Sequence, residues 1–231
     1  MERIILIETS TALCSVALAE DGQITAYRES SAPKAHASLT AVFIQEMLEE
    51  RGLKISDCDA VCVSMGPGSY TGLRVGVSTA KGLCFGAGKP LLAVGTLDTL
   101  VAQASEASIS GLTEAPRFII PMVDARRMEV YTAVFENGKQ VTETEPVIVD
   151  ESSFAEYLEQ GPCLFIGDGA GKCADVIRHP NARFAQCCPK ASSMLSPALA
   201  AYRAGDFKDV AYFEPFYLKE FVATVSKKKM W

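Results

Sequence analysis

Short apolar runs separated by turn signals dominate the first hundred residues. Residues 3–9, 14–19 and 23–29 are three such runs, and an Asp-Gly pair typical of a tight turn separates the second from the third. Residues 60–64 and 90–94 form two more apolar runs of strand length. The pattern predicts a sheet that opens with a three-stranded meander and continues with further strands after helical segments.

Residues 37–51 repeat with a helical period. Leu39, Phe43 and Met47 fall on one line along the predicted helix, and a second line of apolar residues lies beside it. The apolar arc spans roughly 180°, whereas a helix that covers one face of a sheet needs a stripe of only about 100°. We therefore expect this helix to have a second contact surface besides its parent sheet.

A second helix, predicted over residues 72–85, has two faces that look buried. The apolar face consists of Leu73, Val77, Ala80 and Cys84, and the small-residue face consists of Gly72, Gly76, Thr79, Gly82 and Gly86, with Val75 and Leu83. A glycine inside a helix costs about 1 kcal/mol relative to alanine, so several on one face predict that another backbone approaches closely there.

The two helices together suggest a surface for a second chain. The residues that we assign to this partner interface are Leu39, Phe43, Met47, Gly72, Val75, Gly76, Thr79 and Leu83. The alternative is that the glycines only let the first helix of the same lobe lie close.

The loop before the second helix is rich in glycine. Gly66 and Gly68 allow backbone conformations that a Cβ atom would forbid, and Ser69 or Thr71 can cap the first helical turn. The free N–H groups at a helix N-terminus attract anions, and Arg74 lies one turn inside. The loop is therefore either an anion site or simply a turn followed by a capped helix.

The familiar nucleotide-binding fingerprints are not present. Thr71 stands where the spacing of a Rossmann loop requires glycine. A second glycine cluster at residues 167–173 resembles a Walker A loop, but Cys173 replaces its hydroxyl residue and Ile166 its first glycine. We interpret this cluster as a strand-to-helix loop.

The second half of the chain repeats the alternation of strands and helices. Residues 105–116 are rich in Ser, Gly, Thr and Pro and mark a boundary. After it we predict strands at residues 117–123, 128–135, 139–149 and 163–166, an Asn-Gly hairpin at 137–138, and helices at 152–160 and 191–203. We divide the chain into an N-terminal lobe, residues 1–104, and a C-terminal lobe, residues 105–231, which ends in a basic tail.

Composition narrows the function classes. The chain has 231 residues, of which 48% are hydrophobic and 22% charged, and its formal net charge is −6. These values are typical of a globular protein and argue against one that binds nucleic acid by itself. The first apolar run is too short for a secretory core or a membrane span. The eight cysteines include no Cys-x-x-Cys pair, so we expect a cytoplasmic chain with reduced thiols and no membrane contact.

Few residues are available for catalysis. The only histidines are His36 and His179, neither has a second ligand at metal spacing, and we predict no metal site. The two best carboxylates, Glu8 and Asp124, belong to different lobes and could face each other across a cleft. The alternative role for Asp124 is a turn residue that accepts backbone hydrogen bonds.

The first turn of the chain resembles the first phosphate loop of the actin, sugar-kinase and Hsp70 superfamily. In that superfamily an aspartate positions a metal-bound phosphate, and Glu8 takes its place here with one more methylene group.

Four segments together resemble the bacterial TsaB family, also called YeaZ. They are residues 7–10, 66–76, 123–131 and 215–218, so the resemblance spans nearly the whole chain. It implies a two-lobed α/β fold of the actin-like (ribonuclease H-like) ATPase superfamily, in which each lobe is a mixed sheet flanked by helices.

The resemblance also implies a function. TsaB proteins take part in forming N6-threonylcarbamoyladenosine next to the anticodon of tRNA, as degenerate paralogues of the catalytic subunit TsaD. They pair with TsaD through the N-terminal lobe, and the ATPase TsaE docks on the pair. A scaffold without catalysis is implied, and tRNA is reached only through the complex. Whether the free chain is a monomer or a homodimer stays open.

No intrinsic cofactor is implied, and ATP or ADP would bind only in the partner complex. The residues that would lie near such a nucleotide are Glu8, Thr9, Ser10, Gly66, Gly68, Ser69, Thr71, Arg74 and Asp124.

Two enzymatic alternatives remain at this point. A glycoprotease-like metallopeptidase would need paired histidines, which the chain lacks. A sugar-kinase-like phosphotransferase would need an acidic base and complete phosphate loops, and both loops are substituted here.

Overall fold

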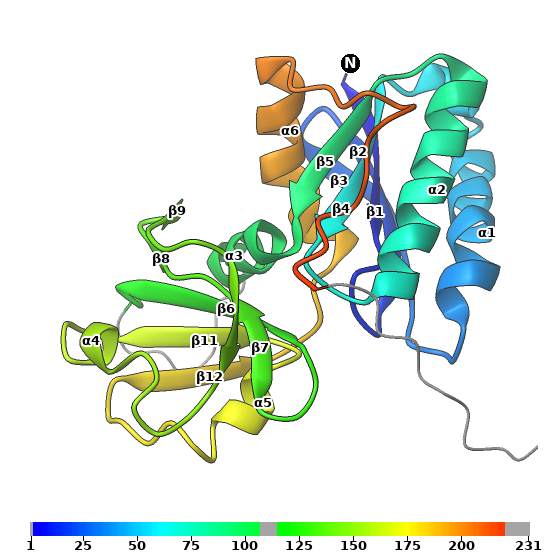
Figure 1. Cartoon of the computed structure of the whole chain (residues 1–231). Helices are drawn as coiled ribbons and strands as arrows, with labels where there is room; N and C mark the ends of the chain where they lie inside the picture. The colour runs from blue at the N-terminus through cyan, green and yellow to red at the C-terminus, as the bar shows by residue number, and fades with distance from the viewer. Residues whose placement is uncertain (1, 107–114, 220–231) are drawn as a thin grey trace, which may run out of the picture.

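The computed structural model describes residues 2–106 and 115–219 and contains two lobes, each built on a sheet (Figure 1). The predicted basic tail lies outside the described residues, as does most of the predicted boundary segment. No helix in the described part of the chain is long and apolar enough to cross a lipid bilayer.

The first sheet contains five strands in the order β3-β2-β1-β4-β5. They are β1 (Arg3–Glu8), β2 (Cys14–Glu20), β3 (Gln23–Ser30), β4 (Ala60–Gly66) and β5 (Leu91–Gly95). The first three pair antiparallel, which confirms the predicted meander, whereas β4 and β5 join β1 in parallel.

Helices cover both faces of this sheet because its central strands are apolar on both sides. On one face lie α1 (Ala35–Glu50) and α2 (Tyr70–Ala87), which pack with Ile5 and Val63. On the other face lie the 3-10 helix η2 (Ala191–Met194) and α6 (Leu195–Ala204). Figure 1 shows α6 on the side of the sheet opposite to α1 and α2. A short 3-10 helix, η1 (Ile55–Asp57), precedes β4.

The second sheet runs in the order β10-β7-β6-β11-β12, with β8 and β9 off this path. Its strands are β6 (Phe118–Asp124), β7 (Glu129–Thr132), β8 (Phe135–Glu136), β9 (Lys139–Gln140), β10 (Glu145–Ile148), β11 (Cys163–Gly167) and β12 (Ala182–Gln186). One face packs on α3 (Thr96–Glu106), and the other packs on α4 (Ala155–Leu158) and α5 (Ala170–Cys173). Both lobes are therefore mixed sheets flanked by helices, as predicted.

Some element boundaries differ from the prediction. The strand expected at residues 139–149 is two short strands, because the Thr142 hydroxyl accepts a hydrogen bond of 2.9 Å from the Val134 N–H where the ladder is interrupted. The predicted Asn-Gly hairpin is present, with Asn137 and Gly138 both at positive φ. The helix expected at 152–160 is a single helical turn between other turns.

The division into lobes at residue 104 is wrong for the end of the chain. From Ala191 onward the chain returns to the first lobe, where Met194 and Ala198 pack against Ile4 and Leu6. The physical reason is that α1 and α2 cover only one face of the first sheet, and the other face needs apolar cover from elsewhere.

Residues 205–219 then cross the edge of the first lobe, and we call them the C-terminal strap. Lys208 forms a β-bridge with Leu91 on strand β5, and the Phe216 N–H donates to the Met65 carbonyl at 2.7 Å. Lys81 of α2 donates to the strap carbonyls of Ala211 and Phe213 at 3.0 and 3.1 Å. The strap thus belongs to the first lobe and ends beside the second.

Candidate functional site

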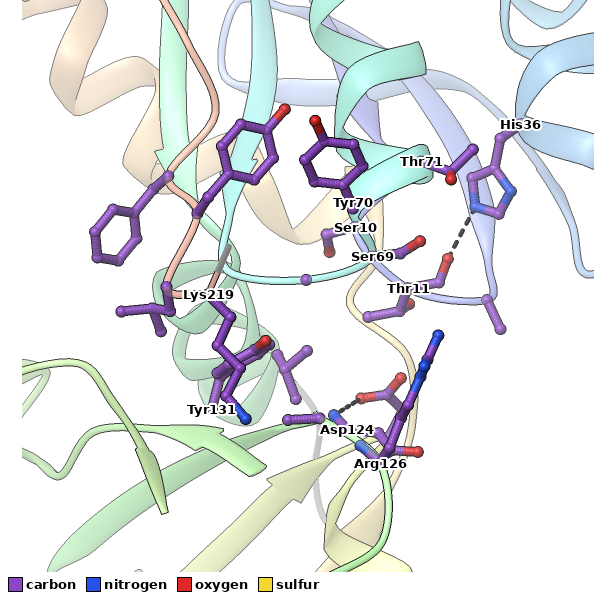
Figure 2. Close-up of a pocket in the computed structure, with 18 residues that line it drawn as sticks. Ser10, Thr11, His36, Ser69, Tyr70, Thr71, Asp124, Arg126, Tyr131 and Lys219 are labelled. Carbon is purple, nitrogen blue, oxygen red and sulfur yellow. Dashed lines mark hydrogen bonds between the residues drawn. The ribbon is translucent and has the colours of Figure 1, made fainter. Parts of the chain in front are cut away.

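A cleft of about 620 Å³ lies between the lobes (Figure 2). Its walls come from the turn after β1, the N-terminal end of α2, the ends of β6 and β11, and the C-terminal strap. The lining residues are Ser10, Thr11, Ala12, His36, Gly68, Ser69, Tyr70, Thr71, Val123, Asp124, Ala125, Arg126, Tyr131, Asp168, Phe216, Tyr217, Leu218 and Lys219.

The predicted nucleotide-proximal residues are only partly brought together. Those that line the cleft are Ser10, Gly68, Ser69, Thr71 and Asp124, and those that do not are Glu8, Thr9, Gly66 and Arg74. Sequence reasoning missed the wall formed by the strap, because nothing in the local pattern indicates that residues 216–219 return to the cleft.

Glu8 ends strand β1 and is completely buried. One carboxyl oxygen accepts a hydrogen bond of 2.7 Å from the Ser10 N–H, and the other, Oε2, has no partner. Burial raises the pKa of the Glu8 carboxyl, and the nearby carboxyl of Asp168 acts in the same direction. Because Glu8 is buried and does not line the cleft, its carboxyl group is poorly placed to hold a metal-bound phosphate there.

The turn after β1 is locked to the start of α2. The Ser69 N–H donates to the Ser10 carbonyl at 2.6 Å, and the Ser69 hydroxyl accepts from the Gly72 N–H. Ser69 is therefore the helix cap, while Thr71 is exposed. A Cβ atom on Gly72 would lie 2.1 Å from the Thr9 carbonyl oxygen, and one on Gly76 would lie 2.2 Å from the Thr9 hydroxyl.

This packing corrects the predicted role of three residues. Gly72 and Gly76 are buried against Thr9 of the same chain, and Met47 is buried in the core of the first lobe. These residues therefore cannot line a surface for another chain. The close backbone approach that the glycines predicted does exist, but it is made by the turn after β1 and not by α1 or a second chain.

The rest of the predicted interface stays at least partly accessible. Its half-buried members are Leu39, Phe43, Val75, Thr79 and Leu83. A second hollow of about 610 Å³ lies along α2, lined by Ala37, Tyr70, Thr71, Arg74, Val75, Ser78 and Thr79. Gly82 and Gly86, further along α2, have open space beside them. We call the exposed side of α2 from Thr71 to Gly86, with the neighbouring part of α1, the α1–α2 face.

The second-lobe wall of the cleft is centred on Asp124. Its carboxylate accepts a hydrogen bond of 2.8 Å from the Arg126 N–H and forms an ion pair with Lys172. The Asp124 N–H donates to the carboxylate of Asp168 at 2.9 Å. Asp124 therefore acts as a turn residue that accepts a backbone hydrogen bond, which was the alternative role given to it in the sequence analysis. The positive charge of Lys172 balances its negative charge.

Lys172 comes from the glycine cluster that resembles a Walker A loop. Its amino group contacts Asp124 and donates to the Glu129 carbonyl at 2.6 Å. The lysine therefore joins α5 to the loop after β6. The strand-to-helix interpretation of this cluster is confirmed, since α5 follows β11 directly.

Neither histidine belongs to a metal cluster in the described residues. The His36 Nε2 atom lies 2.8 Å from the Thr11 carbonyl, and His179 Nδ1 accepts from the Asn181 N–H at 3.1 Å. Across the described ranges, no group of three or more His, Cys, Asp or Glu side chains could hold a metal ion.

Aromatic side chains form the wall nearest the strap. The rings of Tyr70 and Tyr217 lie 4.8 Å apart, and the Arg74 guanidinium lies over Tyr70 at 5.3 Å. Tyr70 and Thr71 line both the cleft and the second hollow, so the first turn of α2 separates the two. Arg74 thus lies on the α1–α2 face and not in the cleft.

The fold and the position of the cleft define the class: a two-lobed α/β protein with an actin-like fold. The activator of 2-hydroxyisocaproyl-CoA dehydratase from Clostridium difficile, solved with bound ADPNP, shares this fold. Its TM-score is 0.50 at 11% identity, over 88% of this chain and 96% of that chain. YeaZ from Pseudomonas aeruginosa is more similar, with a TM-score of 0.81 and 26% identity over 94% of this chain and 100% of that chain.

Sequence comparison gives the family. A family model described as TsaD, tRNA N6-adenosine threonylcarbamoyltransferase, matches residues 29–219. The tRNA threonylcarbamoyladenosine biosynthesis protein TsaB of Escherichia coli is 31% identical over 229 residues, which are 96% of this chain and 96% of that protein. The chain belongs to the TsaB (YeaZ) family, which confirms the resemblance found in its sequence motifs.

Proposed function

We propose that this chain is a non-catalytic scaffold subunit in the formation of N6-threonylcarbamoyladenosine in tRNA. It acts in the cytoplasm, pairs with the catalytic subunit TsaD, and provides the pair on which the ATPase TsaE docks. The names of its relatives support the pathway, since the similar protein of Escherichia coli is named for tRNA threonylcarbamoyladenosine biosynthesis.

One observation carries the non-catalytic part of the proposal. The two carboxylates that line the cleft are already engaged, because Asp124 is paired with Lys172 and Asp168 accepts a hydrogen bond from the Asp124 N–H. Glu8, behind the cleft, is fully buried. A phosphotransferase needs a carboxylate that is free to act as a base or to hold a metal ion. A metallopeptidase needs a cluster of ligands, and the described residues contain none.

The partner surface that we propose is the α1–α2 face. It combines half-buried apolar side chains, such as Val75 and Leu83, with the accessible glycines Gly82 and Gly86. Small residues allow a second helix to approach closely, and the half-buried apolar side chains add area that binding would remove from water. We propose that the same face mediates a homodimer when the chain is alone.

The test is reconstitution of tRNA modification from purified components, with modified nucleoside measured by mass spectrometry. Omission of this chain should abolish modification by TsaD and TsaE. Ser78→Arg, an exposed substitution beside the hollow on α2, should prevent TsaD binding and modification without changing the melting temperature. The matched control is Ile148→Arg, at a side chain on the second lobe that is 72% exposed. This variant should leave both TsaD binding and tRNA modification unchanged.

The same assay distinguishes a scaffold subunit from a catalytic subunit. Asp124→Asn should keep the modification rate within about twofold of the parent, because the proposed chain contributes no catalytic group. A folded Asp124→Asn protein that binds TsaD normally but loses about a hundredfold or more in rate would instead indicate a catalytic subunit.

A further inference from the structure

Arg74 carries a positive charge that no ion pair with another described residue balances. It is exposed on α2 and lines the hollow of about 610 Å³ on the α1–α2 face. Other arginines of the same lobe, Arg3, Arg28 and Arg51, are each paired with a glutamate. The ion pairs between described residues do not include Arg74. Its guanidinium therefore keeps donors for an acceptor outside the described chain.

Tyr70, one helical turn earlier on α2, positions the guanidinium group of Arg74. The Arg74 Cζ atom lies 5.3 Å from the centre of the Tyr70 ring, and Nη1 donates a hydrogen bond of 3.3 Å to the Tyr70 hydroxyl. A cation over an aromatic face is attracted by the electrons of the ring. These two contacts restrict the orientation of the guanidinium before binding, which reduces the entropy that it loses on binding.

Tyr217 of the C-terminal strap supports Tyr70 in turn. The centres of the two rings lie 4.8 Å apart, and their planes are tilted by 34°. The strap is anchored directly beside Tyr217, because the Phe216 N–H donates to the Met65 carbonyl at 2.7 Å. A Cβ atom on Gly66 would lie 2.8 Å from the Phe216 carbonyl oxygen, so the strap backbone is closely packed there. A series of contacts therefore leads from the strap through Tyr70 to Arg74.

The surroundings of Arg74 favour a protein partner. Arg74 is the one charged residue that lines the hollow, and its neighbours there include Ala37, Val75, Ser78 and Thr79, whose side chains are small. Such a surface suits the packing of side chains from another helix. The protein groups that accept two parallel hydrogen bonds from a guanidinium are the carboxylates of Asp and Glu. The hollow therefore fits a helix that presents a carboxylate to Arg74.

We propose that Arg74 is a specificity-determining residue of the α1–α2 face, where it pairs with a carboxylate on a helix of TsaD. Tyr217 is a positioning residue that acts through Tyr70 and Arg74, because it lines the cleft and not the hollow. This inference rests on the proposed pairing with TsaD through the α1–α2 face. It gives one wall of the cleft a part in partner binding on the other side of the first turn of α2.

The test is isothermal titration calorimetry of the purified chain with TsaD at low and at high salt concentration. Arg74→Gln should weaken binding by about tenfold or more, the effect of losing hydrogen bonds to a charged group. It should also reduce the salt dependence of the affinity, because salt screens an ion pair. The matched control is Arg127→Gln, at an exposed arginine between β6 and β7 of the second lobe, which should change the affinity by less than about twofold.

The positioning role of Tyr217 has its own test in the same titration. Tyr217→Ala should weaken TsaD binding by about threefold or more, because it removes the ring that supports Tyr70. Tyr217→Phe keeps the ring and should bind as the parent does. In the Arg74→Gln background, Tyr217→Ala should have no further effect, since it acts through Arg74. Additive effects of the two substitutions would overturn the positioning role.

The melting temperature of each variant, measured first, verifies that it is folded. The inference is overturned if Arg74→Gln binds TsaD as tightly as the parent, and a loss of binding in Ser78→Arg would then leave the proposed partner face standing. If Ser78→Arg also binds normally, the partner face itself is wrong. Normal TsaD binding by Arg74→Gln together with weaker tRNA binding by the assembled complex would overturn the inference too, and would assign Arg74 to RNA.

Discussion

The hydroxyl of Thr9 donates a hydrogen bond of 2.9 Å to the carbonyl oxygen of Gly72, and this contact joins the turn after β1 to the first turn of α2. The two backbones lie so close that only glycine fits at residue 72. The position of α2, which carries the proposed partner face, is therefore set by the same turn that forms the first-lobe wall of the cleft.

Alanine at two glycines of α2 should have opposite effects on stability. Gly72→Ala should lower the free energy of unfolding by about 2–4 kcal/mol, because its Cβ atom would collide with the Thr9 backbone. Gly82→Ala should raise it by about 0.5–1 kcal/mol, because Gly82 is exposed with nothing beside it and alanine favours the helix. Urea denaturation measures both. Equal destabilisation by the two variants would contradict the finding that Gly72 is packed against Thr9 while Gly82 has open space beside it.

Glu8→Gln should change how stability depends on pH. Burial raises the pKa of the Glu8 carboxyl above its ordinary value of 4.5. Between that value and the raised one, the folded state keeps a proton that the unfolded chain has lost, so the free energy of unfolding falls as pH rises. Glutamine has no such proton, and the variant should gain stability relative to the parent as pH rises.

Urea denaturation of both proteins between about pH 5 and pH 8 tests this sign. The Gln side chain keeps an oxygen that can accept the Ser10 N–H bond, so folding should be preserved. A stability difference that stays constant over this range, or that shifts toward the parent as pH rises, would show that Glu8 does not carry a raised pKa.

Lys172→Met should create an affinity for divalent cations. The substitution removes the cation paired with Asp124 and leaves the carboxylates of Asp124 and Asp168 together at the cleft. Carboxylate oxygens are good ligands for Mn²⁺, so we expect Mn²⁺ to raise the melting temperature of the variant and EDTA to reverse the effect. The parent should show no such shift in melting temperature. An equal shift in both proteins would show that the ion pair with Lys172 does not keep cations away from the Asp124 carboxylate.

Lys81→Met should loosen the C-terminal strap. Lys81 holds the carbonyls of Ala211 and Phe213, and its loss should make local opening of the strap easier by about 1 kcal/mol. Chymotrypsin should then cleave within residues 205–219 about five times faster than in the parent, as measured by mass spectrometry. Lys139→Met, at an exposed lysine on β9, is the control. Unchanged cleavage would mean that the β-bridge of Lys208 holds the strap without Lys81.

Local sequence patterns were sufficient to predict most helices and strands of the first lobe. The apolar runs around Ile5, Val16 and Val63 are buried strands, because their length and bounding turns leave few other structures. Strand β12, by contrast, was not predicted, since Arg183 and Gln186 are exposed and the strand has no apolar run. Helix α5 has only four residues, too few for a helical period.

The sequence predicted less of the candidate site than of the fold. Ser10, Ser69 and Asp124 were predicted because each lies in or beside a recognisable turn or loop. Lys172 and Tyr217 were missed, because their roles depend on contacts with residues far away in the chain. The glycines predicted a close approach correctly, but only the structure identifies Thr9 as the neighbour.

The return of residues 191–219 to the first lobe has a consequence for synthesis on the ribosome. The first sheet is made early, yet one of its faces packs on Met194 and Ala198 and its β5 edge pairs with Lys208. The emerging N-terminal lobe therefore exposes an apolar face and an open strand edge while the whole second lobe is being translated. Such surfaces favour aggregation, so the nascent chain should depend on chaperones until residues 191–219 have emerged and packed on the first lobe.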